Sequence, residues 1–335
     1  MKTVKYCIAA ALMALVMSIS GGVSALAAQE VINFGIISTE SSQNLRSVWE
    51  PFLQDMEKKT GFKIRAFFAN DYAGIVTGMQ FNKVQLAWYG NKSAMEAVDR
   101  AGGEVFMQTV AAGGVGGYYS HLIAHVDSPL NNEKDLLANA GKLTFGNGDP
   151  NSTSGFLVPG YYVFSQNNVD PKRAFKRMLN AGHEANAMAV ANKQVDAATS
   201  NSEALERLEI TNPEKRKQIK VIWTSPLIPS DPLVWRKDLS DGTKAKLVAF
   251  FLDYGVNGPD AARELAILED LQWSGFHVSD NDQLIPIRQL ELFKDRNKVA
   301  GEANLDQAEK EAKLAVIDAQ LAELAARQNQ LARSK

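Results

Sequence analysis

Short apolar segments that are expected to form strands alternate with segments of helical periodicity along much of this chain. Residues 31–37 (VINFGII) predict a buried strand, and apolar residues then recur at spacings of three and four over residues 45–56, until Gly61 ends the helix. The next strands are expected at residues 63–68 and 84–89, with a helix between them. Strands that alternate with helices build doubly wound parallel sheets, so the sequence predicts an α/β fold.

The same plan returns in the second half, with strands expected at residues 142–145, 176–179 and 195–199. A weak similarity between the two halves of the sequence places Tyr72 and His183 at comparable positions, each where a strand has ended and a helix begins. Ligands of open α/β sheets bind at that edge. We therefore expect two doubly wound lobes joined by two crossovers, with lobe 1 formed by residues 28–120 and 226–300 and lobe 2 by residues 121–225.

The first 27 residues read as a secretory signal peptide. Lys2 and Lys5 precede an apolar run, and Ala25, Leu26 and Ala27 provide a small-residue cleavage site. The sequence therefore predicts cleavage near Ala27 and export to the periplasm.

Composition excludes several classes of function. The only cysteine, Cys7, lies within the predicted signal peptide, so the mature chain can form no disulfide, cysteine nucleophile or cysteine metal site. Removing Lys2 and Lys5 leaves 34 basic against 38 acidic residues, a balance without the basic excess of nucleic-acid-binding domains. No nucleic-acid partner is expected.

Residues 146–160 (GNGDPNSTSGFLVPG) place hydroxyl side chains at the expected start of a helix. Backbone N–H groups are unpaired there and the helix dipole is positive, so Ser152, Thr153 and Ser154 can cradle an anion without a cationic side chain. The alternative is that Ser152 or Thr153 only caps the helix, the ordinary use of such residues.

The C-terminal segment, residues 301–335, has neither glycine nor proline after Gly301. Five apolar residues follow the alternating spacings of three and four of a coiled coil, with Gln328 at the one missing position: Leu314, Ile317, Leu321, Leu324 and Leu331. We expect a long helix that mediates a homodimer, the alternative being a helix that lies on its own chain.

Enzymatic signatures are weak. No pair of histidines has the helical spacing of a zinc site, and no metal or cofactor is expected. Ser154, His183 and Asp231 could be imagined as a hydrolytic triad, but the sequence lacks the G-x-S-x-G nucleophile elbow. A serine hydrolase remains the alternative from a different functional class.

Several runs of the chain together resemble one known family. The most specific is NGDPNSTSG, and others are NFGIISTESSQNL, DYAGIVTGMQFNK, AWYGNKSAMEAVDRA, NAGHEANAMAVANKQVDAAT and SPLIPSDPLVWRKDLS. These are similar to the periplasmic phosphonate-binding proteins of phosphonate ABC transporters, over nearly the whole mature chain. The resemblance implies the type II periplasmic binding protein fold, with two lobes that close on a ligand.

The resemblance also implies a site and a function. The family's phosphonate-binding positions fall on Tyr72, Tyr118, Ser152, Thr153, Ser154 and His183. Its positions for the amino end of 2-aminoethylphosphonate fall on Glu203 and Asp231. The expected protein is a receptor, not an enzyme, that captures phosphonates and delivers them to a membrane permease.

The chain departs from the family pattern at three places, and one alternative ligand class stays open. Tyr119 stands where tryptophan is expected, a glycine-rich run (113–117) precedes the cleft tyrosine Tyr118, and extra residues occur around 257–261. The first two could alter lobe closure or ligand preference.

The alternative within the same class is a receptor for another small oxyanion, such as phosphite or sulfonate.

Overall fold

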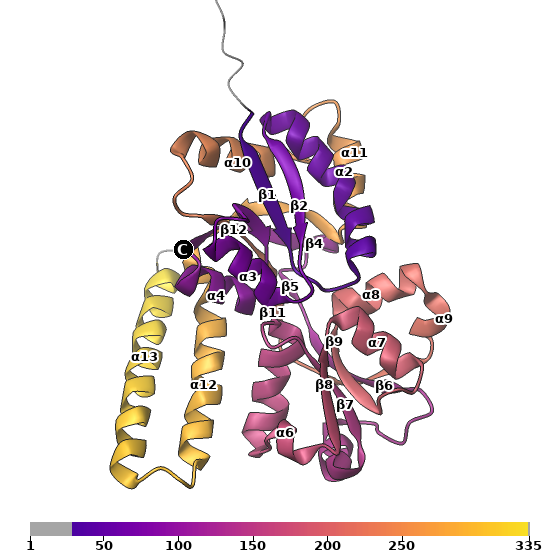
Figure 1. The fold of residues 1–335 in the computed structure, drawn as a ribbon, viewed down its shortest axis with the longest axis vertical. Helices are drawn as coiled ribbons and strands as arrows, with labels where there is room; N and C mark the ends of the chain where they lie inside the picture. The colour runs from indigo at the N-terminus through magenta and orange to yellow at the C-terminus, as the bar shows by residue number, and fades with distance from the viewer. Residues whose placement is uncertain (1–28, 334–335) are drawn as a thin grey trace, which may run out of the picture. The chain divides into compact units, whose positions relative to one another are not determined.

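The computed structural model describes residues 29–333, so the predicted signal peptide lies outside the described residues. Two large sheets organise this part of the chain, as the sequence predicted, and a two-stranded ribbon lies between them (Figure 1). The first sheet has the strand order β13-β4-β12-β3-β1-β2 and the second β10-β6-β9-β7-β8. The ribbon pairs β5 with β11.

The strands of the first sheet are β1 (Val31–Ile36), β2 (Lys63–Phe68), β3 (Leu86–Trp88), β4 (Gly103–Ala111), β12 (Pro232–Arg236) and β13 (Trp273–Val278). Those of the second are β6 (Ser120–His125), β7 (Thr144–Gly148), β8 (Arg177–Ala181), β9 (Ala197–Asn201) and β10 (Ile219–Thr224). The ribbon strands are β5 (Gly117–Tyr118) and β11 (Ile228–Pro229). The chain thus passes between the two sheets twice, through β5 and through β11.

Both sheets are mixed, whereas the sequence predicted parallel ones. β1, β2 and β3 are parallel to their partners, as are β7, β8 and β9, because helices connect them. β12 runs antiparallel to β3, and β6 runs antiparallel to β9. The reason is topological. β6 and β12 each follow a crossover from the other lobe, so each enters its sheet at the edge where the helix-connected strands end. Each therefore runs opposite to those strands.

The helices of the first lobe are α2 (Ser42–Thr60), α3 (Tyr72–Gln80), α4 (Asn91–Arg100), α10 (Asp241–Asp253) and α11 (Ala261–Asp270). The second lobe carries α5 (Glu133–Asn139), α6 (Pro171–Ala174), α7 (His183–Ala191), α8 (Ser202–Thr211) and α9 (Pro213–Arg216). α4 and β13 were not among the predicted elements. His277 lies in β13.

The first lobe has an aromatic core. Trp49 of α2 packs against Trp88 of β3 and Trp273 of β13, with ring centroids 5.5 and 5.2 Å away. Trp49 is 2% exposed. Burial of such large apolar side chains is the main stabilising term for a lobe of this size.

The C-terminal segment forms an antiparallel pair of helices, α12 (Ile285–Gly301) and α13 (Gln307–Arg333), which lie side by side in Figure 1. The five apolar residues of the predicted seam are half-buried, while most of α13 is exposed. Arg296 of α12 pairs with Asp318 of α13 at 2.6 Å. The seam therefore lies against α12 of the same chain, which is the alternative that the sequence left open.

Across residues 29–333, no helix has both the length and the apolar character that a bilayer span requires.

Candidate functional site

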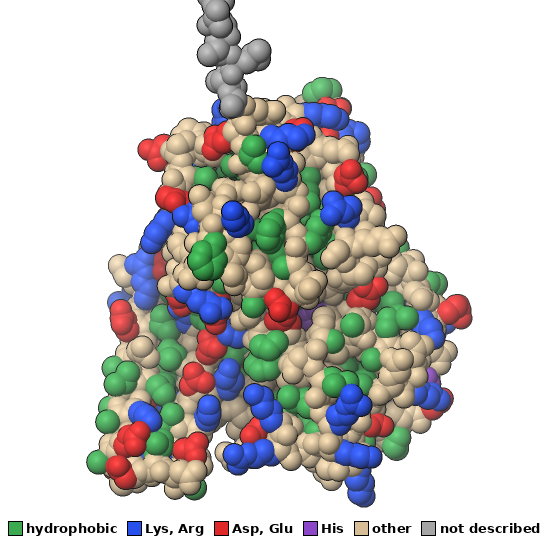
Figure 2. Space-filling model, viewed as in Figure 1, with side chains coloured by type: hydrophobic (Ala, Val, Ile, Leu, Met, Phe, Trp, Pro, Cys, Tyr) green, Lys and Arg blue, Asp and Glu red, His purple; other side chains and the backbone are tan. Residues whose placement is uncertain are grey.

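The residues singled out in the sequence gather at the edge of each sheet that faces the other lobe. β7, β8 and β9 end there, and the residues that follow them are Ser152 to Ser154, His183 and Glu203. From the first lobe, Tyr72 opens α3 after β2 ends, and Asp231 directly precedes β12. All but Glu203 are at least nine-tenths buried, and Glu203 is partly buried. Figure 2 shows acidic side chains and a histidine on the surface at the boundary between the two lobes.

Ser152 and Ser154 converge on one nitrogen of His183. Their hydroxyl oxygens lie 3.3 and 3.4 Å from Nε2 of His183. Ser152 also caps the turn that follows, because its Oγ accepts a hydrogen bond of 2.9 Å from the Gly155 backbone N–H. Asn201 donates to Oγ of Ser154 at 3.2 Å. At Ser152, one side chain therefore both caps the turn and contacts His183.

The turn after Ser152 is a π-helix over Thr153–Leu157, followed by another over Gly160–Phe164, where the sequence predicted an ordinary helix. π-helical turns are rare and occur frequently at functional sites. A Cβ on Gly155 would lie 3.1 Å from Cε1 of His183 and 2.9 Å from Oγ of Ser152. The absence of a side chain at position 155 thus lets the hydroxyl cluster approach the imidazole.

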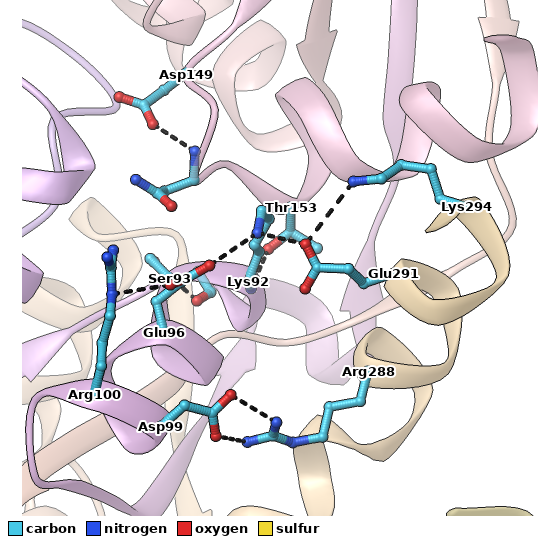
Figure 3. Close-up of polar contacts among 12 residues, drawn as sticks. Lys92, Ser93, Glu96, Asp99, Arg100, Asp149, Thr153, Arg288, Glu291 and Lys294 are labelled. Atoms are coloured by element: carbon cyan, nitrogen blue, oxygen red, sulfur yellow. Dashed lines mark hydrogen bonds and ion pairs between the residues drawn. The ribbon is translucent and has the colours of Figure 1, made fainter. Parts of the chain in front are cut away.

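Thr153 connects this cluster to the other lobe. Its Oγ1 accepts a hydrogen bond of 2.9 Å from the backbone N–H of Lys92, at the start of α4 (Figure 3). Nζ of Lys92, which is 5% exposed, pairs with Glu291 of α12 at 2.9 Å and with Glu96 at 3.2 Å. The pair between Lys92 and Glu291 joins α4 to α12, and the first turn of α4 donates the hydrogen bond to Thr153.

The two tyrosines are buried on the first-lobe side. Burial raises the pKa of Tyr72 well above its usual value, nearby carboxylates add to the rise, and a hydrogen bond with Ser152 opposes it. Burial likewise raises the pKa of Tyr118. Both phenols are therefore neutral near pH 7. The O–H of Tyr72 can donate to an oxyanion, whereas the O–H of Tyr118 is donated to Asp231 in this structure.

Asp231 and Glu203 come from different lobes and influence each other's charge. Burial raises the pKa of Glu203 to about 7, with a contribution from the charge of Glu206. Burial raises the pKa of Asp231 well above its usual value, and the charge of Glu203 adds to the rise. Tyr118 donates to Oδ1 of Asp231 at 2.9 Å. Two neighbouring carboxyl groups with raised pKa values form a site that a cation would stabilise.

A hydrolytic triad is not assembled. Nδ1 of His183 has no hydrogen-bond partner among the described residues, so no acid orients the ring as a base. Asp231 is bonded by Tyr118 and by Asn91 instead. Burial lowers the pKa of His183 to about 4, which leaves the imidazole neutral and suited to donating one hydrogen bond. The alternative of a hydrolytic triad is therefore wrong, because the structure joins Ser154 to His183 but does not join His183 to Asp231 by a hydrogen bond.

Sequence reasoning missed several residues around the site. Asn201 and Asn91 bond directly to predicted site residues. The only sequence signal for Asn201 is its residue type, because asparagine is a preferred N-cap and this one caps α8. Lys92 carried no signal, because its role depends on a contact across the two lobes.

Hydrogen bonds at the rim also join the lobes. Glu184, at the start of α7, accepts from the Ser41 backbone N–H and from Nδ2 of Asn44, each at 2.8 Å. On another side of the site, Oδ2 of Asp149 accepts from the backbone N–H of Tyr72 at 3.2 Å. The two lobes are therefore in contact around the site, as expected of a closed cleft.

Within residues 29–333, His, Cys, Asp and Glu form no group of three that could hold a metal ion. The polar side chains that gather here instead carry hydroxyl, phenol and imidazole groups. Such a set is suited to an oxyanion, and the paired acids nearby are suited to an ammonium group.

Comparisons with known proteins point the same way. Residues 34–284 match the family model described as the periplasmic substrate-binding protein of phosphonate ABC transporters. The chain is 61% identical over 296 residues to the phosphonates-binding periplasmic protein of Escherichia coli K12, covering 88% of this chain and 86% of that protein.

Solved structures agree in fold. The binding-protein component of an ABC phosphonate transporter from Pseudomonas aeruginosa superposes with a TM-score of 0.88 at 64% identity, covering 92% of this chain and all of that one. A Prochlorococcus marinus protein solved with methylphosphonate shares the fold at 22% identity, with a TM-score of 0.68, covering 78% of this chain and 97% of that one. The chain has the type II periplasmic binding protein fold, and it belongs to the family of periplasmic phosphonate-binding proteins of ABC transporters.

Proposed function

We propose that this phosphonate-binding protein prefers 2-aminoethylphosphonate and delivers it to the membrane permease of its transporter. The observation that carries the preference is the pair of acids, Glu203 and Asp231, beside a set of neutral donors. A ligand with a phosphonate at one end and an ammonium at the other satisfies both halves of the site. Ethylphosphonate satisfies only the first.

The phosphonate oxygens would be bound by hydroxyl and imidazole groups of lobe 2 and by the phenols of the first crossover and lobe 1. The proposed phosphonate-binding residues are Tyr72, Tyr118, Ser152, Thr153, Ser154 and His183. Support comes from their burial and from the convergence of Ser152 and Ser154 on His183. Charge-assisted hydrogen bonds to an anion are stronger than neutral ones, so neutral donors suffice.

Selectivity against inorganic oxyanions would come from the same acids. Phosphate, phosphite and sulfonates without an amine would leave both carboxyl groups without a cation to pair with. Buried groups that a wrong ligand leaves unpaired provide much of the discrimination of a binding site.

Lobe closure is proposed to proceed about the two crossovers near β5 and β11, with lobe 1 formed by residues 28–120 and 226–300 and lobe 2 by residues 121–225. The rim contacts of Glu184 and Asp149 support this, because they join side chains of one lobe to backbone of the other. Export would use the predicted signal peptide, with cleavage near Ala27.

A homodimer through the C-terminal helices is also proposed. α13 has no fully buried residue, and Val316 on it is 60% exposed, so the α12 and α13 pair leaves apolar surface that a second copy could cover.

The test of the function is a thermal-shift panel of 2-aminoethylphosphonate, ethylphosphonate, phosphate, phosphite and a sulfonate. A ligand at 100 times its dissociation constant adds about 2.7 kcal/mol of stability. We expect 2-aminoethylphosphonate to give the largest shift at equal concentration. A larger shift with phosphate, phosphite or a sulfonate would assign the receptor to that oxyanion instead.

A further inference from the structure

A small cavity adjoins the candidate site on its Glu203 side. It has a volume of about 50 Å³, and its lining includes Glu203, His183 and Asn201 together with Thr39, Glu40 and Arg207. The residues proposed to hold the phosphonate, apart from His183, are not part of its lining. The cavity therefore extends the site beyond the acid that is proposed to bind the amine.

The walls of the cavity favour a positively charged occupant. Trp49, Trp88 and Trp273 line it, and the ring centroids of Trp88 and Trp273 are 5.9 Å apart. Indole rings attract cations through their faces. Two acids, Glu203 and Glu40, border the cavity, against the one cation Arg207, which already pairs with Glu40 at 3.6 Å.

Two buried donors on the lining have no hydrogen-bond partner among the described residues. These are Nε1 of Trp88 and Nε of Arg207, the latter lying 3.6 Å from Glu40 in an ion pair without hydrogen bonding to it. Buried N–H groups are nearly always hydrogen-bonded, to protein, water or ligand, because an unpaired one costs roughly 1–3 kcal/mol. The cavity exceeds the roughly 10–15 Å³ that one water needs. Its occupant should therefore include an oxygen that accepts these bonds.

The volume sets a size limit. A cavity of about 150 Å³ accommodates the six carbon atoms of benzene, so each carbon atom needs roughly 25 Å³ of cavity volume. By that scale the present cavity holds a group of about two or three non-hydrogen atoms.

We propose that this cavity is a subsite for a small substituent on the ligand's amine, so that the receptor accepts N-substituted 2-aminoethylphosphonates and favours a substituent that ends in a hydroxyl. The inference rests on the proposed function, because it assumes that the amine lies at Glu203. A secondary ammonium keeps its charge between the two acids, while its arm enters the cavity beside the tryptophans that line it. The terminal oxygen then accepts hydrogen bonds that an alkyl arm cannot.

The test is calorimetry with four ligands: the parent 2-aminoethylphosphonate and its N-(2-hydroxyethyl), N-propyl and N-benzyl derivatives. The hydroxyethyl and propyl arms contain the same number of non-hydrogen atoms, so their comparison isolates the hydroxyl. We expect the hydroxyethyl ligand to bind within about tenfold of the parent. The propyl ligand should be roughly threefold to tenfold weaker than the hydroxyethyl one, the value of one net hydrogen bond. The benzyl ligand should be weaker than the parent by about a hundredfold or more, because its arm exceeds the volume.

A variant that fills the cavity gives the structural control. Ala204 lines the cavity and is next to Glu203. Ala204→Leu should weaken the hydroxyethyl ligand by about tenfold or more while leaving the parent within about threefold, and Ala204→Ser, which keeps the volume, should change neither.

Three outcomes would overturn the inference. The first is tight binding of the parent with a hydroxyethyl ligand at least a hundredfold weaker, and the second is equal weakening of both by Ala204→Leu. Both would leave the proposed function standing. The third is failure of the parent itself to bind better than ethylphosphonate, which would remove the proposed amine site and the inference with it.

Discussion

The hydroxyl of Tyr118 donates a hydrogen bond of 2.9 Å to Oδ1 of Asp231. Tyr118 lies in β5, on the first connection between the lobes, and Asp231 follows β11, on the second. The two connections are thus bonded to each other at the site. Asn91 of α4 lies 3.4 Å from the same oxygen and donates to the Pro229 carbonyl at 2.8 Å, which fixes this carboxyl group further.

Ser152→Ala and Ser154→Ala should each weaken every phosphonate by about 1–3 kcal/mol, because each removes a hydrogen bond to a charged group. They should differ in stability. Only Ser152 caps the turn through the Gly155 N–H, so Ser152→Ala should also lower the unfolding free energy by about 1 kcal/mol. Calorimetry and thermal unfolding of the two variants measure both effects. If Ser152→Ala lowers the stability but leaves the affinity unchanged, Ser152 caps the turn and does not bind the phosphonate.

Binding of 2-aminoethylphosphonate should release protons at pH 6. Burial raises the pKa of Glu203 to about 7, so this acid is mostly protonated there and must ionise to pair with the ammonium. The affinity should therefore fall as the pH falls from 8 to 5.5, by up to about tenfold per pH unit for one proton. Calorimetry in buffers of different ionisation enthalpy counts the protons. Ethylphosphonate is the control, and an equal count for both ligands would contradict the role of Glu203.

The same raised pKa has a consequence for the protein without ligand. The folded state binds the Glu203 proton more tightly than the unfolded state, whose carboxyl titrates near its usual 4.5. The contribution of Glu203 to stability should therefore decrease as the pH rises from about 4.5 to 7. His183 acts in the opposite direction, since burial lowers its pKa to about 4, so wild type must be compared with Glu203→Gln. Parallel unfolding curves for the two proteins over this range would be inconsistent with the shift.

Glu184→Ala should weaken all phosphonates alike, by about 1 kcal/mol or roughly fivefold. Its carboxylate bonds across the lobes to Ser41 and Asn44 and lies outside the proposed ligand contacts, so its loss destabilises the closed state only. Glu209→Ala on α8 is the matched control, since that residue is exposed and makes no contact between the lobes. A loss confined to aminophosphonates would show that Glu184 acts on the amine instead.

Much of this arrangement is visible in the sequence, and the reasons for the rest are physical. The alternation of strands and helices predicts which residues follow the strand ends, and that places Ser152 and His183 at the same edge. The antiparallel entry of β12 and β6 depends on the chain crossing between lobes, which local periodicity does not record. β13 was missed because Gly275 and two further polar positions interrupt its apolar pattern. The bond from Lys92 to Thr153 exists only when the lobes meet.

Measuring the oligomeric state tests the proposal that the C-terminal helices form a homodimer. If α12 and α13 pair with a second copy, Val316→Glu should place a charge in that interface and give a monomer that still binds ligand, while wild type sediments as a dimer at tens of micromolar. Ala322→Glu, which adds one negative charge at an exposed position of the same helix, controls for charge alone. A monomeric wild-type protein under these conditions would leave the seam of α13 as packing within one chain.

Calorimetry on Glu203→Gln and Asp231→Asn with 2-aminoethylphosphonate and ethylphosphonate tests the central claim most directly. The two acids come from different lobes, so they can share one ammonium only in the fold described here. Each amide variant should lose about 2–5 kcal/mol for 2-aminoethylphosphonate, the range for removing one partner of a buried charge pair. Ethylphosphonate should bind unchanged or better, because it has no cation for the acids to pair with. Equal losses for both ligands would contradict the account, since the acids would then support the lobes and would not recognise the amine.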